Sequence, residues 1–260
     1  HTVFNIVTTL LLLPFGNFMA KAAQKILPDG KEPKEEKMEL KFIRPFESSY
    51  IVGHGALVLT QIEQEVERMR AMVLHTVAGS FDAVIKSDLS EKKALLEKEE
   101  YVDYLNAEIS RYIVSVMPSE MAVQDSVKLT GFYKILSNLE RVSDHAMNIL
   151  GYAEDIVVRQ ADFSEEARQE ISDMKSVCLE ILDAITIQGW PDAKNVLERT
   201  AKREQKIDDM REKYQRQQMK RMIKGTCKAD ASILYSEMLT DFERIGDHAL
   251  NVAEQYYEMV

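Results

Sequence analysis

An acidic motif with a histidine occurs twice in this sequence, once in each half of the chain. The segments NLERVSDHAMN, residues 138–148, and DFERIGDHALN, residues 241–251, both contain Glu-Arg-x-x-Asp-His-x-x-Asn. In a helix, a glutamate and an aspartate four residues apart project from one face, so each copy presents a pair of carboxylates. These four acids are Glu140, Asp144, Glu243 and Asp247. Neighbouring carboxylates can hold a hard cation or pair with arginine and lysine.

Each motif is preceded by a segment with the same acid spacing. Glu99 and Asp103 are four residues apart, as are Glu204 and Asp208, and Glu204 follows Glu99 by 105 residues. Roughly 20 residues separate each pair from the turn before its motif, so two antiparallel helices place the four acids of one half at the same height. The sequence therefore predicts two clusters of four carboxylates: Glu99, Asp103, Glu140 and Asp144 in the first half, and Glu204, Asp208, Glu243 and Asp247 in the second.

Four adjacent carboxylates repel one another, and two arrangements relieve that repulsion. Bound cations are the first, and oxygen ligands favour Mg, Mn or Fe. Arginine and lysine partners without metal are the second. The histidines are rotated away from the acid face, while the arginines and asparagines are expected to form ion pairs or hydrogen bonds between helices. The candidates for additional ligands or for contacts around the ligands are His145, His248, Arg141, Arg244, Asn148 and Asn251.

Long helices must position these acids. Gly and Pro are scarce, at 10 and 6 of 260 residues, and Glu, Lys, Leu, Met and Ala are frequent. The first three predicted helices match the last three, which indicates an internal duplication of about a hundred residues. The first predicted helix spans residues 52–86, the second runs from a cap at Ser90 to the residue before Pro118, and the third runs from Ser119 to Gln160. The fourth begins at a capping box of Asp162 and Glu165, the fifth runs from Pro191 to Gly225, and the sixth runs from Lys228 to the C-terminus.

The bulk composition is that of a folded, acidic chain. Hydrophobic residues make up 45% and charged residues 29%, and the net charge of −10 argues against general nucleic-acid binding. Cys178 and Cys227 form no Cys-x-x-Cys pair and are interpreted as buried apolar groups. The sequence contains no Gly-rich phosphate loop and no recognisable nucleophile–base arrangement, so no enzymatic activity is predicted.

The N-terminal residues 2–20 contain no charge. At roughly 1.5 Å per residue they reach about 28 Å, close to the thickness of a bilayer core. Lys21 and Lys25 follow, as expected at a cytoplasmic end. We therefore predict a transmembrane segment over residues 1–27 and a linker over residues 28–50. The alternatives are a signal peptide, which would need a basic start and a cleavage site, and a buried core helix.

The two motifs, each closing a three-helix unit, resemble those of the PhoU family of phosphate-uptake regulators. The resemblance covers residues 52–260. It implies an all-α fold with two three-helix bundles, at residues 51–160 and 161–260, and metal clusters at the two acid sets named above. Ser143 stands where the second copy has Gly246, and this departure makes the first cluster the less faithful match.

The segment HTVFNIVTTLLLLPF is similar to the last membrane segment of bacterial sodium/phosphate cotransporters, some of which end in a PhoU-like domain. This similarity implies a bacterial inner-membrane protein with residues 28–260 in the cytoplasm. Its partners would be the membrane, the transporter domain of the same protein, phosphate and sodium, and further copies of the chain. Asn5 would line the transport path.

The leading hypothesis is a metal-binding regulatory domain that modulates uptake by a sodium-dependent phosphate transporter. The alternative is a structural helical module that docks a partner or dimerises without metal.

Overall fold

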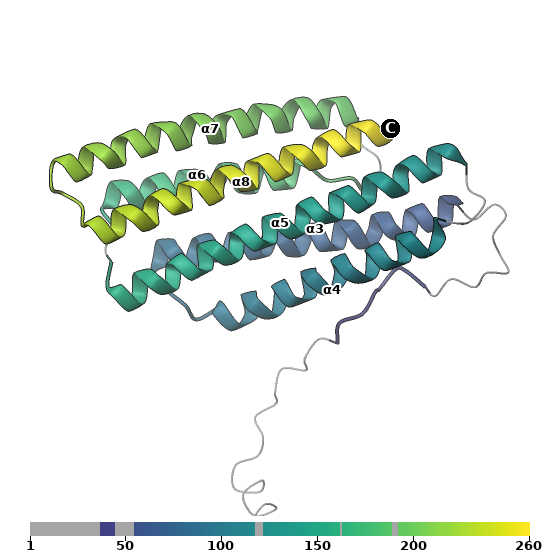
Figure 1. Ribbon diagram of the computed structural model, residues 1–260, viewed down its shortest axis with the longest axis horizontal. Coiled ribbons are helices and arrows are strands. Elements are labelled where there is room, and N and C mark those ends of the chain that lie inside the picture. The colour runs from purple at the N-terminus through teal and green to yellow at the C-terminus, as the bar shows by residue number, and fades with distance from the viewer. Residues whose placement is uncertain (1–36, 45–54, 118–121, 162, 189–191) are drawn as a thin grey trace, which may run out of the picture. The chain divides into compact units, whose positions relative to one another are not determined.

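The computed structural model describes residues 37–44, 55–117, 122–161, 163–188 and 192–260. Within these ranges the chain is all-helical and contains no strand, which confirms the predicted class (Figure 1). The helices are α3 (Gly55–Lys86), α4 (Lys92–Val116), α5 (Val123–Arg159), α6 (Glu165–Ala184), α7 (Ala193–Ile223) and α8 (Ala229–Met259).

The predicted membrane segment at residues 1–27, including Asn5, lies outside the described residues. Among the helices that the structure does describe, none is long and apolar enough to cross a membrane.

Several helix ends differ from the prediction. Ser90 does not cap α4: Asp88 accepts hydrogen bonds from both the backbone N–H and the hydroxyl of Ser90, so the helix begins after Glu91 without a side-chain cap. The cap of α6 is Ser164, whose hydroxyl accepts from the Ala167 N–H. The predicted capping residue of α6, Asp162, and the predicted first residue of the fifth helix, Pro191, lie outside the described residues.

Asp192 caps α7 by accepting from the N–H groups of Lys194 and Asn195. Gly225 follows the end of α7 with a φ of 68°, a conformation that glycine adopts without steric cost. The predicted end of this helix is therefore confirmed.

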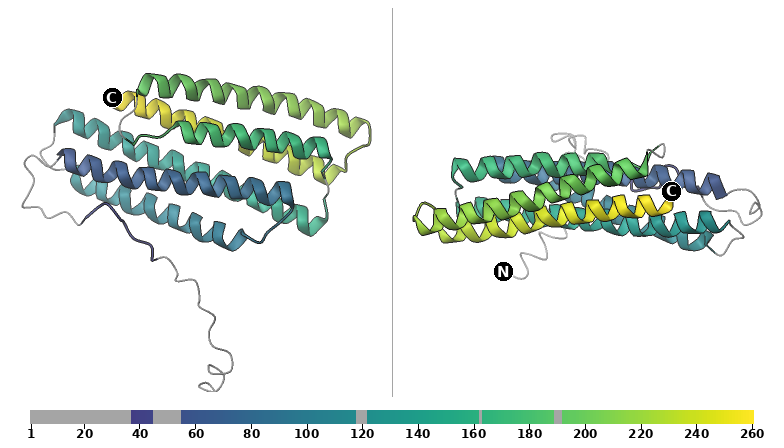
Figure 2. Two further views of the ribbon diagram at one scale, coloured as in Figure 1. Left: turned by 180° about the vertical axis from the view of Figure 1, so that it is seen from behind. Right: turned by 90° about the horizontal axis from the view of Figure 1, so that it is seen from above.

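The helices from each half pack together and meet along a central seam. α5 contacts α3, α4 and α8, while α8 contacts α5, α6 and α7. Figures 1 and 2 show α5 and α8 side by side, running in opposite directions. The rings of Phe81 on α3 and Phe242 on α8 stack at 4.4 Å between centroids, so one apolar core joins residues from both halves. The division into bundles at residues 51–160 and 161–260 stays a prediction.

Part of the predicted linker is held against the first half. The Phe42 N–H donates to Glu65 on α3 at 2.6 Å, and Arg68 donates to the Glu39 carbonyl at 2.8 Å. The Tyr101 hydroxyl on α4 also contacts the backbone of Glu39, at 3.1 Å from its carbonyl oxygen. Residues 39–44, which we call the N-terminal strap, are therefore fixed to α3 and α4.

Candidate metal centres

The second predicted cluster brings three carboxylates together between α7 and α8. One oxygen from each of Glu204, Asp208 and Asp247 lies within 4.8 Å of the others. All three side chains are half-buried. The Oδ1 atom of Asp208 is buried and has no hydrogen-bond partner among the described residues. A carboxylate oxygen left in this state is costly unless a cation binds it, so the donor set fits a hard metal ion.

A close approach of the two helices positions this cluster. A Cβ atom at Gly246 on α8 would lie 3.1 Å from Cδ1 of Ile207, the residue before Asp208 on α7. That distance is tighter than ordinary van der Waals contact, so a glycine at this position lets α8 lie close to α7. The equivalent residue in the first half is Ser143.

The fourth acid of the second cluster is paired with an arginine. Nε of Arg211 lies 3.1 Å from Oε2 of Glu243, and Nη1 of Arg244 lies 3.0 Å from Oδ2 of Asp247. The predicted ion pair of Arg244 is therefore present, but both of its residues lie on α8, so it does not connect two helices. Sequence reasoning missed Arg211. The feature of the sequence that could have identified Arg211 was its position on α7, three residues after Asp208.

Burial and mutual repulsion act on the acids of the second cluster. Burial, and after it the charges of Asp208 and Asp247, raise the pKa of the Glu204 carboxyl. Burial and the Asp247 charge likewise raise the pKa of Asp208. The pKa of Glu243 is raised by burial, although Arg211 opposes this shift. Each raised pKa indicates a site that favours protonation or a bound cation.

The first predicted cluster places its four acids on α4 and α5. Burial, followed by the charges of Asp103 and Asp144, raises the pKa of Glu99. Burial, followed by the same two charges, also raises the pKa of Glu140. Within the described ranges, none of these four acids forms an ion pair with a lysine or arginine. They therefore repel one another without a direct counter-charge.

A pocket of about 580 Å³ opens beside the first cluster. Glu99 and Asp144 line it together with Arg141, His145 and Asn148. Arg141 is exposed, and its charge lowers the pKa of Glu140 against the larger effect of burial. Acidic, basic and imidazole groups thus share one solvent-accessible space.

The histidine and asparagine of the first motif cross to the opposite half. Nδ1 of His145 lies 2.6 Å from Oδ1 of Asp241 on α8, and Nδ2 of Asn148 donates to the same oxygen at 3.1 Å. Asp241 is buried, so these two donors satisfy a carboxylate that water scarcely reaches.

The second motif makes the equivalent contacts in the other direction. Nδ1 of His248 lies 3.0 Å from Oδ1 of Asn138 on α5, and Nδ2 of Asn251 donates to that oxygen at 3.2 Å. The rings of His145 and His248 stack with centroids 5.6 Å apart. One nitrogen of each histidine is thus committed to the α5–α8 seam. Ligation of metal by either histidine stays a prediction.

Asn138 and Asp241 were not predicted as site residues. Both open their motif, and Asp241 follows Asn138 by 103 residues, the same offset that relates Glu140 to Glu243. That shared offset was the signal that could have identified them.

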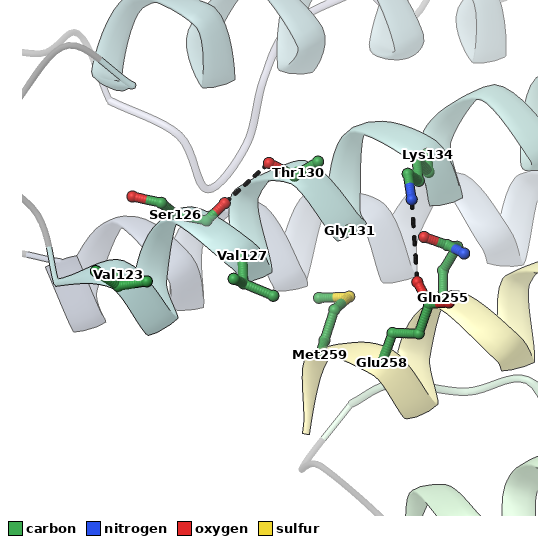
Figure 3. Close-up of a pocket in the computed structure, with 9 residues that line it drawn as sticks. All are labelled: Val123, Ser126, Val127, Thr130, Gly131, Lys134, Gln255, Glu258 and Met259. Carbon is green, nitrogen blue, oxygen red and sulfur yellow. Dashed lines mark hydrogen bonds and ion pairs between the residues drawn. The ribbon is translucent and has the colours of Figure 1, made fainter.

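A separate pocket of about 280 Å³ lies between the start of α5 and the end of α8 (Figure 3). Val123, Val127 and Met259 give it a mainly apolar lining, and Lys134 lies 3.9 Å from Glu258 at its edge. Gly131 gives Met259 room, because a Cβ there would overlap the methionine side chain. None of the predicted metal-site residues lines this pocket.

Comparisons with known proteins point to one family. The chain is 22% identical over 203 residues to "Phosphate-specific transport system accessory protein PhoU homolog 1" of Thermotoga maritima, covering 78% of this chain and 87% of that protein. It is 25% identical over 173 residues to "Putative inorganic phosphate export protein YjbB" of Salmonella typhimurium, covering 66% of this chain and 31% of that protein. The crystal structure of PhoU from Pseudomonas aeruginosa shares the fold, with a TM-score of 0.73, 19% identity and coverage of 78% of this chain and 97% of that one.

These findings correct the predicted localisation. The expectation of a bacterial inner-membrane protein is wrong, because the chain matches 87% of a Thermotoga relative that is named as an accessory protein of a phosphate transport system.

The sequence profile of the PhoU domain gives the family directly. It matches residues 66–153 and 171–256, once in each half and over more than half of the chain. Each matched range contains one Glu-Arg-x-x-Asp-His-x-x-Asn motif and the acid pair on the helix before it. The chain belongs to the PhoU domain family.

Proposed function

We propose that this chain regulates phosphate transport as a metal-binding helical module without catalytic turnover. Its family membership supports this, as do the names of the two relatives, both of which concern phosphate transport. By this proposal the chain acts by binding, and the partner is a phosphate transporter. The sodium-dependent class of that transporter and self-association of the chain stay predictions.

One observation carries the metal-binding part of the proposal. Glu204, Asp208 and Asp247 converge from two helices, and the buried Oδ1 of Asp208 has no partner among the described residues. A divalent cation such as Mg, Mn or Fe would neutralise these charges and tie α7 to α8. The first cluster would hold its cation in the same way between α4 and α5. Metal occupancy would then set how firmly each helix pair is joined.

The test combines metal content with phosphate uptake. The full chain is purified without affinity metals, and its bound metal is measured by plasma mass spectrometry beside a quadruple variant, Glu140→Gln, Asp144→Asn, Glu204→Gln and Asp208→Asn. The control is Glu100→Gln with Asp209→Asn, two exposed acids next to cluster positions. We expect metal in the wild type and the control, and none in the quadruple variant.

The same variants are then expressed in cells that lack the chain, and phosphate uptake is measured at low and high external phosphate. The wild type and the control should change uptake between the two conditions. The quadruple variant should not, although it folds. Uptake that responds equally with every variant would contradict a metal-dependent regulatory role.

A second candidate is a docking or dimerisation module that needs no metal. The ion pairs of Glu243 with Arg211 and of Asp247 with Arg244 favour it, since they already neutralise half of the second cluster. This candidate predicts no stoichiometric metal in the wild type and an unchanged unfolding temperature after treatment with chelator.

A further inference from the structure

The hairpin that joins α7 to α8 buries polar side chains and exposes apolar ones. Figure 1 shows this turn at one end of the helices, and we call residues 218–233 the α7–α8 tip. Inside the tip, Gln218 and Ser232 are each only 2% exposed, and Gln218 donates to the Ser232 hydroxyl at 2.8 Å. The exposed apolar side chains are Met219, Met222, Ile223 and Ile233, at 62%, 48%, 81% and 57%. Packing within the described part of the chain does not account for these four side chains.

These apolar side chains form a patch that spans both helices. The three that lie on α7 are three and four positions apart, so they share one face of that helix. The hydrogen bond between Gln218 and Ser232 joins the two helices. Met219 and Ile233, the next residue on each helix, therefore lie within about 3 Å of the same height along the hairpin.

Polar contacts hold the tip in place from its inner side. The Arg221 guanidinium donates to both carboxylate oxygens of Glu170 on α6, at 2.9 and 2.7 Å. Arg221 also donates to the Gln218 side chain at 2.8 Å, and its carbonyl accepts from the Thr226 hydroxyl at 3.1 Å. The patch is thus presented on a preorganised frame, which reduces the conformational entropy lost when a partner binds.

Positive charges surround this patch. The exposed lysines of the tip are Lys220, Lys224 and Lys228. None of the three forms an ion pair among the described residues, whereas the nearby Arg216 is paired with Glu212 at 3.3 Å. Asp230 is the one acid in the sequence of the tip. A chain whose net charge is −10 therefore carries an apolar patch with a positive rim at this end.

The equivalent hairpin of the first half has apolar residues without these lysines. The offset of 105 residues makes Val114 and Met117 on α4 the counterparts of the two methionines of the patch, and they are 59% and 42% exposed. Ser115 stands where the second half has Lys220. The combination of apolar and positive groups thus distinguishes the α7–α8 tip from its counterpart.

We propose that the α7–α8 tip is a docking surface for an acidic amphipathic helix of a protein partner. The apolar face of such a helix covers the methionines and isoleucines, and its acids pair with the lysines of the rim. Methionine side chains suit this task because they adapt to the shape of the partner. The proposal goes beyond the regulatory function above and does not depend on metal binding.

An anionic membrane surface fits the same patch less well. A bilayer faces far more of the molecule than the tip, and the negative charge of the chain opposes its approach to anionic lipid. A single helix contacts the tip alone, where lysines outnumber acids. Charge complementarity therefore favours the helix.

The test uses a synthetic peptide and the methionine methyl groups of the full chain. The peptide has about 18 residues, roughly five helical turns, with leucines on one face and glutamates on both sides of them. A scrambled peptide of the same composition has no apolar face. Both are titrated into protein labelled with ¹³C at the methionine methyls, and Met219→Leu and Met222→Leu assign the two signals of the patch. We expect the amphipathic peptide to shift these signals and to bind at least about tenfold more tightly than the scrambled one.

Variants at exposed positions locate the binding surface. Met222→Ser with Ile223→Ser should weaken binding by about tenfold or more, because apolar contact area is lost. Lys220→Gln with Lys224→Gln should weaken it by roughly threefold to tenfold, and added salt should act in the same direction. The matched control, Val114→Ser with Met117→Ser, should leave binding unchanged. Circular dichroism checks that every variant is folded.

Each contrary result would overturn the proposal in a different way. Equal binding of the two peptides, or binding that the Met222 and Ile223 changes do not alter, would show that the tip is not a helix-docking surface. Response of the same methyl signals to phosphatidylglycerol vesicles and not to the peptide would assign the patch to lipid. Signals that shift with protein concentration alone would assign it to a second copy of the chain. The metal content of the acid-cluster variants tests the proposed function separately, because none of those acids lies in the tip.

Discussion

The α4–α5 and α7–α8 helix pairs carry four acids at equivalent positions, yet different groups surround those acids. In the second pair, Arg211 and Arg244 each hold one acid, and glycine at position 246 draws α8 close to α7. In the first pair the acids repel one another beside an open pocket, and the residue equivalent to Gly246 is Ser143, whose buried hydroxyl has no hydrogen-bond partner among the described residues. A duplicated framework thus fixes where the acids lie, while single neighbouring residues decide which charges each acid contacts.

Two buried glutamates at equivalent positions also have different partners in the two halves. Glu65 on α3 and Glu170 on α6 are 105 residues apart, the offset that relates the two halves. Glu65 pairs with Arg68 of its own helix at 2.7 Å, whereas Glu170 pairs with Arg221 of α7 at 2.7 Å. The same buried carboxylate therefore fixes the strap in one half and a neighbouring helix in the other.

Breaking these buried pairs should give the largest effect. Arg221→Ala should lower the free energy of unfolding by about 3–5 kcal/mol, because Glu170 would keep only the hydroxyl of Tyr235. Arg68→Ala should cost a similar amount, since Glu65 would keep only the N–H of Phe42. Urea unfolding followed by circular dichroism measures both. The exposed Arg216 provides the control, and a large difference between the two variants would show that the two glutamates are not equivalent.

The two sets of hydrogen bonds between α5 and α8 should differ in their contribution to stability, because one acceptor is charged and the other is neutral. Asp241→Ala leaves His145 and Asn148 without their shared acceptor and should cost about 2–3 kcal/mol, as expected for hydrogen bonds to a charged group. Asn138→Ala removes a neutral acceptor from the equivalent place and should cost about 1 kcal/mol. Thermal unfolding of both variants tests this ranking, and equal losses would mean that the charge of Asp241 contributes nothing.

Exchanging the small residues should change stability in opposite directions. Gly246→Ser should destabilise the chain by about 1 kcal/mol, because the new Cβ would press on Ile207. Ser143→Ala should stabilise it by roughly 0.5–1 kcal/mol, because a buried hydroxyl without a partner is removed. Chemical unfolding of the metal-free protein compares the two. Destabilisation by Ser143→Ala would indicate that its hydroxyl has a partner in solution.

His248 gives the chain a pH-dependent contribution to its stability. Burial, and then the positive charges of His145 and Arg141, lower its pKa to about 4. The unfolded chain therefore binds a proton at this residue between about pH 6.5 and 4 while the folded chain does not, so its contribution to stability is lost as the pH falls through that window.

Asn138→Asp makes the second set of hydrogen bonds resemble the first and tests this shift. A carboxylate next to Nδ1 of His248 should raise its pKa toward the usual range and reduce the loss of stability in acid. Titration of the imidazole signals by NMR measures the change in the metal-free protein. A pKa that stays near 4 would mean that burial and the neighbouring positive charges outweigh the new carboxylate.

The helices, and the alignment of the acids on paired helices, could be predicted from the sequence, because both follow from local periodicity and from one turn within each half. The sequence was insufficient for the crossing of His145 onto Asp241, because the register of α5 against α8 depends on packing between residues 96 apart in the chain. The pairing of Arg211 with Glu243 was missed for a related reason. A long arginine can reach several acids, and only the packed helices decide which one it meets. The predicted cap at Ser90 was wrong because α4 begins later, after Glu91, and Ser90 belongs to the preceding turn, where it donates to Asp88.

The N-terminal strap has a mechanical consequence. Its backbone is tied to Glu65 and Arg68 on α3 and to Tyr101 on α4. Tyr101 lies between Glu99 and Asp103 in the sequence, so it shares one helical turn with two acids of the first cluster. A tension applied to the chain before Glu39 would be borne first by these hydrogen bonds and delivered to that turn of α4. The acids of the second cluster have no such attachment within the described ranges. A force applied at this end would therefore act on the first cluster and not on the second.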